Sequence, residues 1–257
     1  MNLRTVLMTL AFGAALFRPM AGWSQDFRVD TDVFLGDAKE PVSETLTIFA
    51  GDVVYDFILN GPEEITIFDV NRGRIVLLDS ARSVRATLTT DQLLQLSAAM
   101  KSVGGAEERQ TLLNPQFASR FDEPTSQLEL TSAGLIYRAK GIKPKVDTAV
   151  QRFQQFADWY ARLNAVRPGN LPPFGRIELN QSLAEHHLVP EEIERTIIVD
   201  RSLGDKQYRA RSRHTFIWTL SSTDRKRIER AGREQSAFRA VNPAEYWQVA
   251  RVASKNR

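Results

Sequence analysis

The sequence contains no cysteine, and it has only three histidines among its 257 residues. The absence of cysteine excludes disulfide bonds, thiol catalysis and the lipid-modified cysteine that anchors bacterial lipoproteins. The fold must therefore be held together by its own apolar core. A chain of this length can bury enough apolar surface for that, in one domain or two small ones.

Local catalytic and metal-binding motifs are also missing. There is no Gly-x-Ser-x-Gly nucleophile motif and no glycine-rich phosphate loop. His186 and His187 are adjacent, whereas zinc-binding histidines on a helix are four residues apart, and His214 is distant from both. We therefore expect no metal and no other cofactor. An enzyme that uses only carboxylates needs no local motif and stays among the hypotheses.

Three strand-like runs each end on an aspartate that follows an apolar residue, at Asp56, Asp69 and Asp79. If these strands pair in sequence order, the three carboxylates could share one face and form a cation site or an acid–base pair. Aspartates at strand ends more often lie in turns or on the solvent face. A carboxylate-dependent hydrolase is therefore the third of three functional hypotheses.

Residues 1–24 have the layout of a secretory signal peptide. Arg4 supplies positive charge, Val6 to Leu16 form an apolar run, and small residues follow up to Ser24. The apolar run is shorter than the roughly 20 residues that cross a bilayer. We expect the leader to be cleaved, and the remaining chain to be secreted or periplasmic and not membrane-spanning.

Most of residues 27–79 predict an antiparallel meander. The runs are rich in Val, Ile, Thr, Phe and Tyr, and short glycine-containing turns separate most of them, which forces neighbouring strands to be antiparallel. The predicted strands cover residues 27–34, 45–49, 53–59, 64–70 and 74–79. Further strands are expected in a hairpin over 128–137 and over 193–199 and 207–220.

Three helices are predicted from apolar residues at helical spacing, over residues 90–103, 147–164 and 222–238. Residues 107–125 read as irregular, and residues 170–174 as a stiff connector. The predicted fold class is α+β, a curved antiparallel sheet (meander) with packing helices. We expect residues 25–170 to hold the sheet with helices, and residues 171–257 to be a basic C-terminal region packed on the same domain.

The helix over 147–164 carries an aromatic cluster. Its members are Phe153, Phe156, Trp159 and Tyr160. Such a stripe is more often ordinary core between a helix and a sheet, but it could also line a pocket for an apolar small molecule or lipid.

Charge is distributed unevenly along the chain. Residues 195–257 hold 15 basic and 6 acidic side chains, net +9, whereas residues 25–194 hold 17 and 25, net −8. The helix over 222–238 concentrates five of the cations: Arg225, Lys226, Arg227, Arg230 and Arg233. These residues could bind an anionic surface, or they could pair internally with the acidic region. The expected export disfavours nucleic acid as a partner.

Five segments carry a family resemblance: FRVDTDVFLGD (27–37), VVYDF (53–57), RGRIVLLD (72–79), FADWYARLNA (156–165) and LPPFGRIELN (171–180). Together they resemble uncharacterised secreted proteins of planctomycete-type bacteria. This resemblance implies export and bacterial origin, and no activity.

The order of leader, meander and packing helices is also similar, in architecture only, to periplasmic lipoprotein carriers of the LolA type. Those proteins fold as an incomplete barrel whose concave face holds acyl chains beneath a helical lid. No residue motif supports the similarity, and architecture alone is a weak indicator of function.

These features favour an exported binding protein of unknown ligand. The first hypothesis is a carrier of an apolar ligand or lipid. The alternative is a cell-envelope interaction protein that docks on an anionic partner through its basic C-terminal third.

Overall fold

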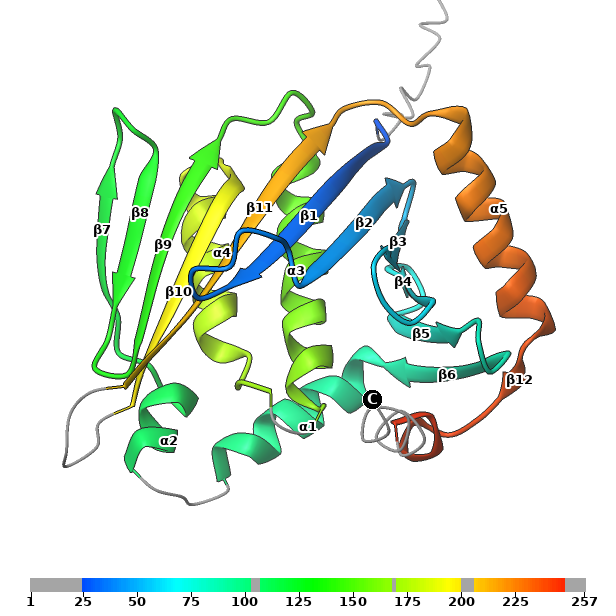
Figure 1. The fold of residues 1–257 in the computed structure, drawn as a ribbon, viewed down its shortest axis with the longest axis horizontal. Helices are drawn as coiled ribbons and strands as arrows, with labels where there is room; N and C mark the ends of the chain where they lie inside the picture. The colour runs from blue at the N-terminus through cyan, green and yellow to red at the C-terminus, as the bar shows by residue number, and fades with distance from the viewer. Residues whose placement is uncertain (1–24, 103–106, 168–169, 200–205, 248–257) are drawn as a thin grey trace, which may run out of the picture.

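The computed structural model describes residues 25–102, 107–167, 170–199 and 206–247, and it shows twelve strands paired into one strongly curved sheet (Figure 1). The strands are β1 (Phe27–Leu35), β2 (Ser43–Ala50), β3 (Val53–Ile58), β4 (Glu64–Asp69), β5 (Arg74–Asp79), β6 (Val84–Thr89), β7 (Ala118–Asp122), β8 (Gln127–Thr131), β9 (Leu135–Ile142), β10 (Val189–Val199), β11 (Lys206–Ile217) and β12 (Arg239–Ala240). The helices are α1 (Thr90–Ser102), α2 (Glu107–Leu113), α3 (Ala149–Ala165), α4 (Phe174–Glu185) and α5 (Ser222–Ala237).

The predicted meander is present, because β1 to β6 each pair antiparallel with the next strand. Gly51 and Gly73, in the turns before β3 and β5, have φ of +53° and +54°. Residues with a side chain rarely adopt this conformation, which explains glycine at these two turns. The predicted hairpin over 128–137 is also present, as β8 and β9.

β1 lies near the middle of the sheet, between β2 and β11, so strands from opposite ends of the chain are hydrogen-bonded neighbours. Beyond β11 the sheet continues through β10, β9 and β8 to β7 at one edge. At the other edge β12 pairs with β6, in parallel. The fold class is therefore α+β with a large, mostly antiparallel curved sheet, as predicted.

The sheet curls around α3, which gives it an inner and an outer face (Figure 1). The main core joins the inner face to α1 and α3, and includes Phe27, Phe49 and Phe156. On the outer face α5 covers a second core that includes Ile48 and Ile67. Strands β2 to β5 are thus covered on both sides, which explains why β4 and β5 are buried along nearly their whole length.

The other half of the sheet is covered on the inner face. A third core lies between α4 and β8 to β10 and includes Leu128, Leu179 and Ile193. The opposite face carries ion pairs, among them Arg138 with Glu129 at 2.6 Å and Arg138 with Glu194 at 3.6 Å. The alternating burial along β9 is typical of a sheet with one buried and one solvated face.

Two parts of the sequence prediction were wrong. Residues 107–125, expected to be irregular, contain α2 and the edge strand β7, and the connector over 170–174 leads directly into α4. α4 escaped prediction because its buried residues include Gly175 and Asn180, which are not an apolar stripe. Its burial is decided by α3 and the sheet around it.

Details of the predicted helices also differ. In α1, Leu93 is buried as expected, but Leu96 is 44% exposed, and Ser97 is buried instead, with its hydroxyl bonded to the Leu93 carbonyl at 2.7 Å. The N-cap of α5 is Ser221, the residue before the predicted start of the helix at 222, and its hydroxyl accepts from the Asp224 backbone N–H. The predicted leader over residues 1–24 lies outside the described residues.

None of the described helices is both long enough and apolar enough to cross a membrane.

Candidate functional site

A narrow crevice lies where α3 and α4 meet the start of β10, lined by apolar side chains together with the amides of Gln154 and Asn180. The residues around it include Val150, Phe153, Asn180, Leu183, Ala184 and Leu188. Its volume is about 10 Å³, which is the space of about one water molecule. The crevice is therefore a closed seam between the helices and the sheet.

Of the four aromatic residues predicted to line a pocket, Phe153 is the one that lines this crevice. Phe153 and Phe156 both pack near Phe49 of β2, with ring centroids 6.4 Å and 5.7 Å away. Trp159 lies 6.3 Å from the ring of Phe68, and Tyr160 lies 5.4 Å from that of Phe156. The structure brings the four together as one stripe of the inner core.

Polar groups begin at the α4 wall of the crevice. Arg176 Nε donates a hydrogen bond to Asn180 Oδ1 at 2.9 Å, and Asn180 Nδ2 donates to Asp158 Oδ1 at 2.8 Å. Burial raises the pKa of Asp158, while its bond from Asn180 and the charges of Arg162 and Arg176 lower it. Asn180 is 3% exposed, lines the crevice and bonds to Asp158, so it connects the crevice to this carboxylate.

A second arginine lies on the sheet side of this group. Arg195 of β10 faces Tyr137 of β9 as a cross-strand pair and hydrogen-bonds to its hydroxyl. Burial raises the pKa of Tyr137, and the charges of Arg195 and Arg176 lower it. Burial lowers the pKa of Arg176, and the positive charge of Arg195 lowers it further. The negative charges of Tyr137 and Asp158 act in the opposite direction and raise it. The two guanidinium groups are therefore close enough to repel each other.

His214 of β11 completes the interior polar cluster. Its ring lies within hydrogen-bond distance of Thr31 Oγ1 at Nδ1 and of Ser212 Oγ at Nε2, both at 3.0 Å. Burial, assisted by the charge of Arg176, lowers the pKa of His214 to about 3. The ring is thus neutral at pH 7 and does not offset a nearby negative charge.

Sequence reasoning missed Arg176, Asn180 and Arg195. Arg176 and Asn180 belong to α4, which was not predicted as a helix, because the sequence indicated only a connector over 170–174. Arg195 sits in a predicted strand, but its partners Tyr137 and Arg176 come from 58 and 19 residues earlier in the chain. The one available signal was the alternation of β10, which puts Arg195 on the same face as buried Ile193.

The five cations predicted as an anion-binding set lie on α5 and behave in two ways. Arg227 is paired with Asp224 at 3.7 Å, and Arg230 is paired with Glu63 at 3.0 Å and Glu234 at 2.6 Å. The other three are exposed and form no ion pair with the described residues: Arg225, Lys226 and Arg233. Internal pairing and a free basic face are thus both present on one helix.

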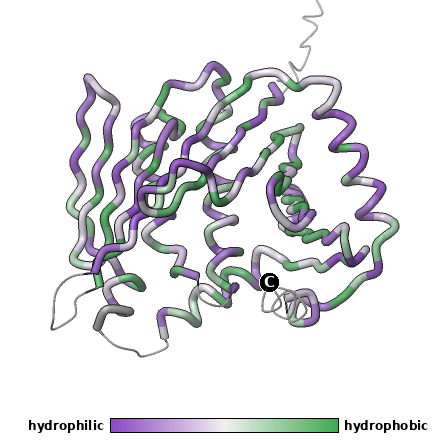
Figure 2. Tube along the Cα trace, in the orientation of Figure 1, coloured by the Kyte–Doolittle hydropathy of each residue, from purple (hydrophilic) through white to green (hydrophobic). Residues whose placement is uncertain are grey.

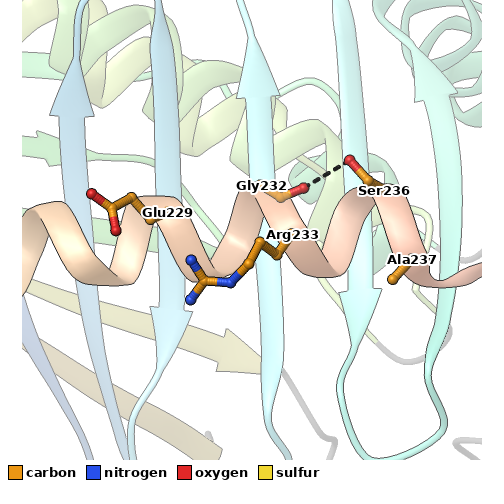
Figure 3. Close-up of a pocket in the computed structure, with 5 residues that line it drawn as sticks. All are labelled: Glu229, Gly232, Arg233, Ser236 and Ala237. Carbon is orange, nitrogen blue, oxygen red and sulfur yellow. Dashed lines mark hydrogen bonds between the residues drawn. The ribbon is translucent and has the colours of Figure 1, made fainter.

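α5 is hydrophilic along most of its length (Figure 2). A shallow, open hollow on its surface is lined by Glu229, Gly232, Arg233, Ser236 and Ala237 (Figure 3). Ser236 Oγ donates to the Gly232 carbonyl at 3.0 Å within the helix (Figure 3). The hollow has no enclosing walls, so it is part of the surface of α5 and not a ligand pocket.

The aspartates that motivated the hydrolase hypothesis do not form one cluster. Asp56 and Asp79 lie on the inner face of the sheet, whereas Asp69 lies on the outer face, paired with Arg72 at 3.0 Å. Among the described residues there is no group of three or more His, Asp and Glu side chains that could hold a metal. Each of the three carboxylates has its own hydrogen-bond donor.

No family model and no curated protein sequence matches this chain. Among solved structures, a LolA superfamily protein from Nitrosomonas europaea is similar with a TM-score of 0.26 and 7% identity, over 77% of this chain and 87% of that one. A superposition at this level does not establish a common fold or ligand. The resemblance to secreted planctomycete-type proteins stays a prediction.

Proposed function

We propose that this protein is an exported carrier of an apolar or amphiphilic ligand, which it holds between α3, α4 and the inner face of the sheet. The observation that carries the proposal is the position of the apolar crevice. It lies at the junction where two covering helices meet a curved sheet, with Phe153, Leu183 and Leu188 around it. A ligand that enters there exchanges apolar contacts between the helices and the sheet for apolar contacts with itself.

The inner face of the sheet is suited to an acyl chain. Phe27, Phe49, Phe216 and Trp218 stack there, with Phe27 and Phe49 only 4.3 Å apart. Burial stabilises by about 0.8 kcal/mol per methylene, so a chain of about twelve methylenes supplies about 10 kcal/mol. That free energy is large enough to offset a partial separation of α3 and α4 from the sheet.

The proposal is tested with N-phenyl-1-naphthylamine, a neutral probe whose fluorescence rises in apolar surroundings. Wild-type protein should bind it at about one probe per chain. Ala184→Phe fills the crevice, so it should weaken binding at least about tenfold. Gln181→Phe adds the same ring to an exposed position of α4 and is the matched control. Absence of binding, or equal loss in both variants, contradicts the carrier.

A second function is favoured by the three free cations of α5. Arg225, Lys226 and Arg233 form a basic face that fits an anionic membrane surface in the cell envelope, where each cation contributes about 1 kcal/mol. The variant with all three changed to glutamate should lose salt-sensitive co-sedimentation with phosphatidylglycerol vesicles. Arg230→Glu, which disrupts internal pairs, should instead lower the melting temperature and leave vesicle binding nearly intact. If wild-type protein does not co-sediment with these vesicles at low salt, this function is ruled out.

Export is part of the proposal and rests on the sequence of residues 1–24. Intact-mass measurement of protein recovered outside the cytoplasm of its host should show the loss of about two dozen residues. Recovery of chains that retain Met1 would contradict it.

A further inference from the structure

The interior of this protein holds an excess of positive charge beside the crevice. Arg176 of α4 and Arg195 of β10 face the space between α4 and the inner sheet, and Asp158 is the carboxylate whose charge acts on Arg176. Neither arginine forms a salt bridge with any carboxylate of the described residues, and Asp158 is instead held by Asn180 at 2.8 Å. Asp158 therefore forms a salt bridge with neither guanidinium group.

Other partly buried arginines of the chain have a direct partner: some form ion pairs, and others, such as Arg152 and Arg162, donate to backbone carbonyls. Arg28 meets Asp224 and Asp30, each at 3.0 Å, and Arg82 meets Asp79 at 2.7 Å. Removing a charge from water without such a partner is unfavourable, so arginines that are partly buried and lack an ion pair are informative. The Nε atom of Arg195 is buried and has no hydrogen-bond partner among the described residues, as in Arg28 and Arg167, but those two arginines form ion pairs and Arg195 forms none with the described residues.

The unpaired charge is connected to the crevice by Asn180. This side chain lines the crevice, and its Oδ1 accepts the Nε–H of Arg176, which fixes the orientation of the guanidinium group. The terminal amino groups of Arg176 form no hydrogen bond with the described residues. They remain available as the planar, two-donor fork that matches a carboxylate or phosphate.

We propose that Arg176 and Arg195, with the hydroxyl of Tyr137, bind the anionic group of the carried ligand, which is therefore an amphiphile with a carboxylate or phosphate head and an apolar chain. The proposal rests on the carrier function and specifies its ligand class. The head group is drawn into the interior, and the chain lies along the apolar crevice between α3 and α4.

The proposal is tested by competition, in which four compounds are compared for their ability to displace bound N-phenyl-1-naphthylamine: oleate, oleoyl lysophosphatidate, oleyl alcohol and inorganic phosphate. The first three have the same chain with a carboxylate, a phosphate or a neutral head. For wild-type protein, at least one of the two anionic lipids should displace the probe at about tenfold lower concentration than the alcohol. The better of the two identifies the head group. Displacement by inorganic phosphate alone would show a free-anion site and overturn the amphiphile.

Arg176→Met is the informative variant, and Arg138→Met on the outer face of the sheet is its control with the same loss of charge. Arg176→Met should weaken binding of the anionic lipid about tenfold and leave the alcohol within about twofold. Arg138→Met should change neither. Arg195→Met should repeat the effect of Arg176→Met, and thermal melting shows which variants are folded.

The outcomes separate the two proposals. If wild-type protein binds neither the naphthylamine probe nor oleyl alcohol, the carrier function itself fails. If it binds the alcohol and both anionic lipids equally well, the carrier stands and the head-group site is wrong. That second comparison uses wild-type protein alone, so it holds even where an arginine variant does not fold.

Discussion

The carboxylate of Asp56 in β3 accepts a hydrogen bond from the hydroxyl of Tyr160 in α3, inside the main core of the protein. Thr47 of β2 donates a second hydrogen bond to the same carboxylate at 2.6 Å. Asp56 is 3% exposed, so this polar contact joins helix to sheet in an otherwise apolar interface. Its charge state therefore affects how firmly α3 is held.

Asp56→Asn should change the pH dependence of stability. Burial raises the pKa of Asp56 from 3.8 to about 6, against the opposing hydrogen bonds from Thr47 and Tyr160. A carboxyl group whose pKa is raised on folding contributes stability at low pH, and this is lost as pH rises through about 6. The loss is about 3 kcal/mol, at 1.36 kcal/mol per pKa unit. Asparagine does not titrate, so the Asp56→Asn variant should not lose this stability as the pH rises.

Urea unfolding of Asp56→Asn and wild type at pH 4 and pH 7 measures this effect. The variant should gain stability relative to wild type at the higher pH. Asp37→Asn, at an exposed aspartate, is the control and should show the same difference from wild type at both values. A constant difference for Asp56→Asn as well would mean that this carboxyl group is not titrating in the folded protein.

His214 should affect the pH dependence of stability in the opposite direction, so that stability falls as the pH is lowered. Burial lowers its pKa from 6.5 to about 3, so the unfolded chain binds the proton first as pH falls below 6.5. The stability that depends on a neutral His214 is complete above 6.5 and is lost towards pH 3. Between pH 7 and pH 5 the loss is about 2 kcal/mol.

His214→Gln removes the titrating group and should flatten this part of the stability profile. The measurement is the free energy of unfolding at pH 7 and pH 5 for wild type, His214→Gln and the exposed control His186→Gln. If His214→Gln loses as much stability as wild type between these two values, the acid sensitivity has another source.

Phe156→Ala should destabilise the protein by about 3–5 kcal/mol, because it opens a cavity where α3 packs against Phe49. Leu94→Ala, at a side chain of α1 that is 45% exposed, should change stability by less than about 0.5 kcal/mol. Thermal melts of the two variants suffice. Equal melting temperatures for wild type and Phe156→Ala would show that α3 is not packed in this way.

Asp224→Ala should cost about 3–5 kcal/mol, because it removes the partner of a partly buried Arg28 and breaks the cap of α5. Asp224 is fully buried and accepts from the Ser221 backbone at 2.8 Å, the Ser221 hydroxyl at 2.7 Å and Arg28 at 3.0 Å. Asp30→Ala removes the more exposed partner of Arg28 and should cost about 1 kcal/mol or less. Chemical denaturation of both variants tests the contrast, and equal losses would refute it.

The free and the paired cations of α5 show how far sequence reasoning reached on the candidate sites. The basic helix and its five cations were evident from residue order, because helical spacing and charge are local properties. Which of them are neutralised depends on Glu63, which is 167 residues from Arg230 and is brought to it by the packing of α5 on the outer face. No local pattern contains that contact.

The sequence by itself determined the strands β1 to β5, the hairpin of β8 and β9, the helix α3 and the basic character of α5. Each follows from a period of two or 3.6 residues and from turn residues nearby in the chain. Only the tertiary structure decided that β1 lies between β2 and β11, that α4 is a helix, and that Arg176 and Arg195 share one interior space. These depend on contacts between distant segments, whose free energy comes from burial that no short stretch of sequence makes alone.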